Sequence, residues 1–138
     1  MPATSTSNFT IFIPIEPAPA SRPKVSRYGV RYSKSHMQYQ HDFKRWLSET
    51  NTTDWPFVGK ELVGVDLEYL CTKARTSRLI TPRYDLDNLI KLTHDCFTSS
   101  KLLWADDVTV ASITAHKRFR SPDDEEAGTW FSMSWPDQ

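Results

Sequence analysis

The chain has 138 residues, a length typical of one domain, and its 17 basic and 17 acidic residues give a formal net charge of zero. This balance excludes an unstructured polybasic or polyacidic binding protein. The charge is nevertheless uneven, because residues 20–45 contain seven basic side chains and one acid, whereas residues 121–138 contain five acids and no lysine or arginine. Both segments are compatible with ordinary solvated surfaces, but the first is also compatible with a face that binds phosphate.

The cysteines and the apolar segments of the chain indicate the cellular compartment. Cys71 and Cys96 are the two cysteines and form no CxxC pair, so we expect neither a disulfide framework nor a zinc knuckle. The first eight residues carry no basic or long apolar segment of the kind found in a signal peptide. No run of about 18 apolar residues would span a membrane. We therefore expect a cytoplasmic protein without a membrane partner.

The first half of the chain is predicted to form a strand, a hairpin and a helix. After a polar tail over residues 1–8, large apolar residues alternate over 9–15, which is typical of a strand, and the proline-rich segment 14–23 ends it. Residues 25–32, centred on Gly29, predict a tight hairpin. A helix then begins with Ser35 as N-cap, and its apolar stripe is Tyr39, Phe43, Trp46 and Leu47.

The second half is predicted to complete a mixed sheet. Residues 63–71 alternate with a period of two and indicate a strand, and the polar, cation-rich segment 72–84 is a loop. A second helix over 85–98 is followed by a strand over 108–119, an acidic loop over 121–128 and a last strand over 129–135. The apolar stripe of that helix is Leu86, Leu89, Ile90, Thr93 and Phe97. These elements favour a single α/β (α+β) domain over 1–138, with both helices on one face of the sheet.

The densest chemical motif is Asp85-Leu86-Asp87-Asn88, followed by Lys91. Residues two apart on a helix point about 200° apart, so the two carboxylates can face one ion only if Asp85 precedes the helix. Asp87 and Lys91 are four apart and share a face. Two acids at a helix start are also an ordinary capping device, and Lys91 can simply pair with Asp87 and Asp95.

A second carboxylate pair, Asp106-Asp107, follows the helix. Three or four aspartates without a histidine or thiol pattern suit a hard divalent cation such as Mg²⁺, for which Mn²⁺ is expected to substitute. Such a site suits phosphoryl chemistry, in which Lys91 stabilises negative charge or positions a water molecule. Two other patterns are rejected. Asp42-Phe43-Lys44, similar to half of a restriction-nuclease signature, lies on the apolar stripe of the first helix, and the histidines lack zinc-ligand spacing.

The motif Asp85-Leu86-Asp87-Asn88, with Lys91, Asp95 and then Trp104-Ala105-Asp106-Asp107, resembles the RusA family of Holliday junction resolvases. Arg22-Pro23-Lys24 and Arg31-Tyr32-Ser33 extend the resemblance over about residues 10–120. It implies a RusA-like fold and a small homodimeric, Mg²⁺-dependent endonuclease of the type found in bacteriophages and prophages. It also implies that Asp85, Asp87 and Asp107 are catalytic metal ligands, that Lys91 is catalytic and that Asp106 belongs to the same acidic cluster. Tyr84 stands where the family commonly continues an arginine run.

The resulting hypothesis is a structure-selective endodeoxyribonuclease that resolves four-way DNA junctions by paired symmetric nicks, in recombination and repair. Homodimerisation follows from the symmetry of the substrate, and no small-molecule cofactor is expected. The alternatives are a non-catalytic junction-binding protein and a metal-dependent nucleotide phosphohydrolase. The side chains expected to hold DNA phosphates are Arg22, Lys24, Arg27, Arg31 and Arg83.

Overall fold

The structure is a computed structural model that describes residues 5–137. These residues form one α+β domain with a four-stranded mixed sheet, a separate two-stranded hairpin and two α-helices. The elements in chain order are β1 Thr6–Ile13, β2 Lys24–Ser26, β3 Gly29–Arg31, α1 Lys34–Glu49, β4 Val63–Cys71, α2 Leu86–Ser100, the 3-10 helix η1 Asp107–Thr109, β5 Val110–Phe119 and β6 Gly128–Pro136. Among the described helices, none is long and apolar enough to cross a membrane.

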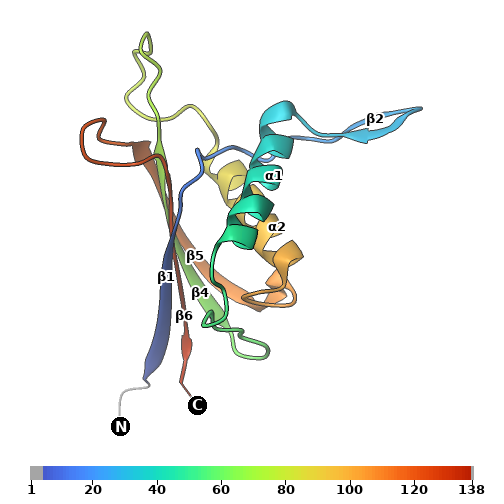
Figure 1. Ribbon diagram of the computed structural model, residues 1–138, viewed down its shortest axis with the longest axis vertical. Helices are drawn as coiled ribbons and strands as arrows, with labels where there is room; N and C mark the ends of the chain where they lie inside the picture. The colour runs from blue at the N-terminus through green and yellow to red at the C-terminus, as the bar shows by residue number, and fades with distance from the viewer. Residues whose placement is uncertain (1–4, 138) are drawn as a thin grey trace.

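The four-stranded sheet has the strand order β1-β6-β4-β5. β4 and β5 are parallel, whereas β6 is antiparallel to both β1 and β4. Parallel neighbours need a crossover connection, and α2 supplies it, so β4, α2 and β5 form a βαβ unit. Both helices cover the same face of the sheet (Figure 1), which confirms the predicted fold class. The carboxyl ends of β4 and β5 therefore lie at the same edge of the sheet, where α2 begins.

The core lies between the sheet and the two helices. Alternate residues of β4, among them Leu67 and Tyr69, are buried beneath the helices, as the period of two predicts. On α2, Phe97 lies edge-on to Phe43 of α1, with ring centroids 5.0 Å apart. The Tyr69 hydroxyl lies 2.9 Å from Thr93 Oγ1 of α2. These contacts fix α2 on the sheet and so determine where its first residues stand.

Several element boundaries differ from the sequence-based prediction by one to three residues. The first strand begins at Thr6, so residues 6–8 are part of β1 and not of a polar tail, and residues 1–4 lie outside the described part of the chain. The N-cap of α1 is Ser33 and not Ser35, because the Ser33 hydroxyl accepts a hydrogen bond from the backbone N–H of His36. The strand expected over 108–119 is preceded by the turn of η1 and begins at Val110.

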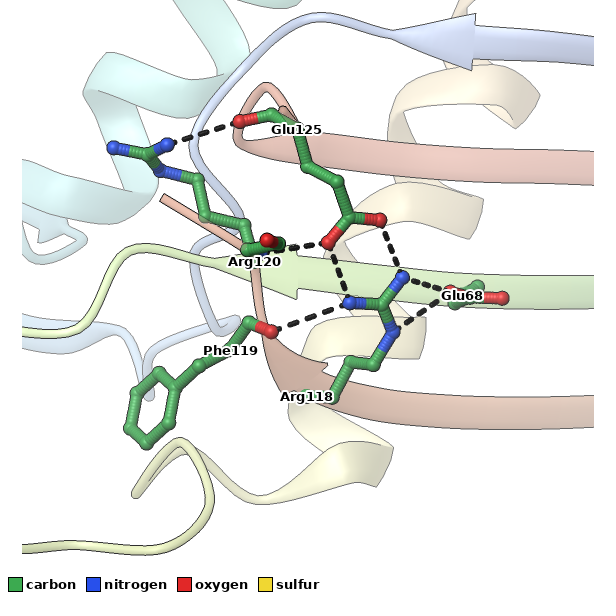
Figure 2. Close-up of polar contacts among 6 residues, drawn as sticks. Glu68, Arg118, Phe119, Arg120 and Glu125 are labelled. Carbon is green, nitrogen blue, oxygen red and sulfur yellow. Dashed lines mark hydrogen bonds and ion pairs between the residues drawn. The ribbon is translucent and has the colours of Figure 1, made fainter. Parts of the chain in front are cut away.

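The acidic loop before β6 is held by ion pairs. Arg118 of β5 donates two hydrogen bonds, of 2.7 and 2.6 Å, to the Glu125 carboxylate, and its guanidinium also pairs with Glu68 of β4 (Figure 2). Arg120 donates a 2.9 Å hydrogen bond to the Glu125 carbonyl. The Arg118 guanidinium and the Ser121 amide, which hydrogen-bond to the Glu125 carboxylate, lower its pKa to about 2. Arg118, Arg120 and Glu125 are therefore committed to holding this loop against the sheet.

Candidate active site

The helix α2 begins directly after Asp85, which occupies the N-cap position. A carboxylate there usually accepts a hydrogen bond from the free N–H groups of the first turn. The Asp85 side chain makes no such bond. Asp87 lies in the first turn, and both side chains are exposed. Within residues 5–137 neither carboxylate forms an ion pair, so the capping explanation is not supported and the oxygens are free for a ligand.

Lys91 lies one turn further along α2, four residues after Asp87 and four before Asp95. Its side chain is exposed, and in the described part of the chain it forms no ion pair with either aspartate. The alternative in which Lys91 only completes a helical ion-pair ladder is therefore not supported. The ammonium group shares the helix face of Asp87 and is available to a bound anion.

In the second acid pair, the Asp106 carboxylate accepts a hydrogen bond and the Asp107 carboxylate does not, among the described residues. Asp106 is the N-cap of η1, and its Oδ1 accepts a 3.1 Å hydrogen bond from the backbone N–H of Val108. Asp107 is exposed and, among the described residues, its carboxylate accepts no hydrogen bond. Its negative charge acts on His94 of α2, where it opposes the lowering of the histidine pKa by burial. This difference agrees with the choice of Asp107 over Asp106 as principal ligand, which stays a prediction.

The two acid pairs lie at opposite ends of α2 (Figure 1). Asp85 and Asp87 stand beyond the carboxyl end of β4, whereas Asp106 and Asp107 precede the amino end of β5. α2 itself, with Asp87 in its first turn, has 15 residues and is about 22 Å long. Among residues 5–137, no three His, Cys, Asp or Glu side chains are grouped so that they could hold a metal ion. One subunit therefore presents two separate pairs and not a single four-residue cluster.

The proline-rich segment after β1 passes over the first turns of α2. The backbone N–H of Ala20 donates a 2.8 Å hydrogen bond to the carbonyl of Asn88, which follows Asp87 directly. Arg22 lies two residues further on and is exposed. Arg83, also exposed, precedes Asp85 by two residues, with its guanidinium 5.8 Å from the centre of the Tyr84 ring. The structure thus brings two of the predicted phosphate-binding arginines to the same end of α2 as the first acid pair.

The hairpin of β2 and β3 carries the other three predicted DNA contacts. It projects away from the body of the domain (Figure 1), and Gly29 at its turn has a φ of 117°, which favours glycine. Lys24 and Arg31 face each other across the two strands, and Arg27 lies 5.0 Å from the Tyr28 ring centre. Like charges in a direct cross-strand pair destabilise an isolated hairpin. A bound anion between Lys24 and Arg31 would remove this repulsion.

His36 connects the base of this hairpin to α1, on which it lies. Its Nδ1 accepts a 2.9 Å hydrogen bond from the backbone N–H of Ser21, and its ring stacks on Tyr32 at 4.3 Å. Burial lowers the pKa of His36, with Asp95 opposing and Lys91 reinforcing the shift. A neutral imidazole is required for Nδ1 to accept this bond. The histidine therefore anchors the segment that carries Arg22 beside α2.

The remaining sequence hypotheses about side-chain roles are resolved as follows. Asp42 of the rejected nuclease-like pattern accepts hydrogen bonds from Gln38 and Arg45, and Phe43 is buried, so this segment is structural. Cys71 and Cys96 are free and buried, and burial raises their pKa values to about 11 and about 12. These thiols are inert at neutral pH.

Lys117 of β5 was not singled out from the sequence. Its side chain lies on the helix side of the sheet, and its Nζ donates hydrogen bonds of 2.8 Å to the carbonyl of Pro82 and 2.6 Å to that of Tyr84. It therefore touches the residue that precedes Asp85. A usable signal was present, since Lys117 shares its strand face with Ile113 and Ala115, where a lysine is unusual.

The family comparison agrees with this geometry. The sequence model of the family described as endodeoxyribonuclease RusA matches residues 14–124, which include the hairpin, both helices and both acid pairs. No curated protein matches the chain. The family match confirms the resemblance derived from the Asp85–Asn88 and Trp104–Asp107 motifs. The chain therefore belongs to the RusA family of endodeoxyribonucleases.

Proposed function

We propose that the protein is a divalent-metal-dependent endonuclease that resolves four-way DNA junctions as a homodimer. The observation that carries this proposal is the set of unpartnered charges at one end of α2. Asp85 and Asp87 have free carboxylates, and Lys91 has a free ammonium beside them. Exposed arginines flank this group on two segments. Membership of an endodeoxyribonuclease family supports DNA as the substrate.

The chemistry of the free donors fits Mg²⁺. This cation prefers carboxylate oxygens, is usually held by one or two of them and completes its coordination with water and phosphate oxygens. Asp85 and Asp87 would supply the two carboxylates, because neither is engaged by a cap or an ion pair in the described structure. When bound, the cation would polarise the scissile phosphate and lower the pKa of an attacking water.

The protein's own residues account for binding and charge stabilisation. Lys91 would stabilise the negative charge that develops on the phosphodiester, because it lies on the helix face of Asp87. Arg22 and Arg83 would hold phosphates beside the site, and the hairpin cations Lys24, Arg27 and Arg31 would hold a more distant part of the junction. These contacts weaken as the salt concentration rises.

A homodimer is supported by the separation of the acid pairs as well as by the symmetry of a junction. If Asp107 belongs to the metal site, as the family resemblance implies, the partner subunit would have to supply it to Asp85 and Asp87. β5 is an edge strand of the sheet, and Val108 and Ile113, close to Asp107 in the chain, expose 77% and 44% of their surface. Exposed apolar residues on an unpaired strand edge suit contact with a second copy.

The experiment is a cleavage assay on a labelled four-way junction. The protein is first bound in EDTA, and Mg²⁺ is then added. We expect a retarded complex in EDTA and symmetric nicks in opposite strands after Mg²⁺, with Mn²⁺ also effective. Binding without nicks would indicate the non-catalytic alternative, and release of phosphate from nucleotides without junction cleavage would indicate a phosphohydrolase. The cytoplasmic location remains a prediction.

A further inference from the structure

Lys117 is a lysine on the core-facing side of a strand. It pairs with Tyr69 of β4 in the parallel register, and the neighbouring position on the same face, Ala115, packs against the core. A half-buried ammonium is costly unless its donors are satisfied, and a lysine that served only for solubility would lie on the open face of the sheet. Here two of its three N–H donors are used on two carbonyls of one loop.

The two carbonyls immediately precede the candidate site. Pro82 and Tyr84 lie on either side of Arg83, so one ammonium fixes alternate peptide groups of the segment that leads into Asp85. The hydrogen bonds of 2.8 and 2.6 Å are those of a charged donor and are stronger than neutral ones. Lys117 therefore holds the backbone on the loop side of Asp85, up to the residue that directly precedes it.

The loop is tied to the rest of the fold at its start, where the Thr72 amide donates to the Glu16 carboxylate and Arg120 donates to the Thr72 hydroxyl. Between that anchor and Pro82 the described hydrogen bonds are local, from the Ser77 amide to the Ala74 carbonyl and from the Leu79 amide to the Ser77 hydroxyl. A hollow of about 310 Å³ opens beside the loop, lined in part by Cys71, Pro82 and Phe119. Asp85 itself makes no side-chain capping bond that would hold its carboxylate. On the helix side the Asp85 carbonyl accepts hydrogen bonds from the Asn88 and Leu89 amides, and on the loop side Lys117 holds the backbone through Pro82 and Tyr84.

We propose that Lys117 is a positioning residue for the metal-binding carboxylate Asp85, and that it acts by clamping the carbonyls of Pro82 and Tyr84. The inference rests on the proposed function, since it takes Asp85 as a metal ligand. It adds a residue from β5 to a site otherwise built from α2 and the segments before it. The side chain itself touches neither metal nor DNA.

The test compares Mn²⁺ binding by calorimetry on DNA-free protein for the wild type, Lys117→Met and Lys117→Arg. Lys117→Met should weaken Mn²⁺ binding by about tenfold, the effect typical of losing an outer-shell partner. Lys117→Arg should restore most of the affinity, because a guanidinium also donates to two carbonyls. Hydrogen exchange of the peptide that spans residues 82–88 should accelerate in Lys117→Met and not in Lys117→Arg.

Lys73→Met is the matched control for the loss of one positive charge. Lys73 Nζ lies 5.6 Å from the centre of the Phe119 ring. Phe119 is two residues beyond Lys117 and lies on the same face of β5. Removing a cation near the site by itself favours a divalent metal, so Lys73→Met should bind Mn²⁺ at least as tightly as the wild type. Equal Mn²⁺ affinity in Lys117→Met and Lys73→Met would overturn the proposal.

If Lys117→Met does not fold, as judged by circular dichroism, Lys117→Gln replaces it, because an amide can satisfy one of the two carbonyls. A reduced Mn²⁺ affinity in folded Lys117→Gln would support the clamp, and wild-type affinity would overturn it. Failure of the wild type itself to bind Mn²⁺ would contradict the proposed metal site. Normal binding by the wild type and by Lys117→Met would contradict the role of Lys117 alone.

Discussion

Two groups of charged side chains in this protein differ in whether their charges form ion pairs. In the first, Arg118 is shared between Glu125 and Glu68 (Figure 2), and every charge has a partner. In the second, Asp85, Asp87 and Lys91 lie together without ion pairs in the described structure. Paired charges hold a loop on the sheet, whereas carboxylates without a protein partner are available to a cation. The two groups thus differ in whether their acids have protein partners within residues 5–137, and the acids without partners are the ones predicted to bind metal.

The largest effect is expected from Asp87→Asn, which removes a free carboxylate and leaves the helix backbone unchanged. Cleavage should fall by at least about a hundredfold, because a metal-assisted step depends on several kcal/mol of charge stabilisation. Junction binding in EDTA should be unchanged or tighter, since one charge that repels phosphate is lost. The measurements are nicking rates with Mg²⁺ and gel retardation without it. A parallel loss of binding and cleavage would instead indicate a misfolded helix.

The next prediction tests whether the two acid pairs of one site come from different subunits. The expected effect is a recovery of cleavage when two inactive variants are combined. Heterodimers of Asp87→Asn with Asp107→Asn subunits, purified through two affinity tags, should each regain one intact site if the partner subunit supplies Asp107. They should nick one strand, whereas both homodimers should be inactive. Heterodimers of Asp87→Asn with Asp85→Asn are the matched control and should stay inactive, because both changes affect the same pair. No recovery in the first heterodimer would place the complete site within one chain.

A smaller loss is expected from Lys91→Ala. The ammonium is unpaired in the described structure, so its removal should lower turnover by about tenfold to a hundredfold through lost stabilisation of developing charge. The affinity for the junction should change much less. Single-turnover cleavage at saturating protein measures the first quantity and gel retardation the second. An unchanged rate would leave Lys91 as a surface residue.

The smallest effect on cleavage is expected from Glu125→Gln, which alters the paired group. The substitution should instead change how stability depends on pH, because Arg118 and Ser121 lower the pKa of Glu125 from its ordinary value to about 2. A lowered pKa means that the contribution to stability is present above pH 4.5 and is lost as the pH falls toward 2. Thermal unfolding between pH 7 and pH 2 should therefore show a steeper acid loss of Tm in the wild type than in Glu125→Gln. Equal slopes would contradict a structural role for this ion pair.

Local patterns in the sequence correctly predicted most of the fold. The period of two in β4 predicted Val63–Cys71, and the apolar stripe around Leu89 and Phe97 predicted α2. Ser35 was wrongly chosen as the cap of α1, because Ser33 and Ser35 are equally good caps by composition and only the backbone decides between them. From the sequence, Trp104 could belong to the core or line the site beside Asp106, and the fold decides for the core, because the side chain is fully buried and its Nε1 donates a hydrogen bond to Thr98.

The sequence by itself determined which residues are the candidates for the chemistry, because the Asp85–Asn88 motif and Lys91 are recognisable from local spacing and carboxylate chemistry. Only the tertiary structure decided how they are arranged. The parallel pairing of β4 and β5 makes α2 a crossover, which sends Asp106 and Asp107 to the far end of the helix. The same pairing brings Lys117 to the loop before Asp85. Neither arrangement is encoded in local periodicity, because the strand pairing and the Lys117 hydrogen bonds join residues more than 30 positions apart.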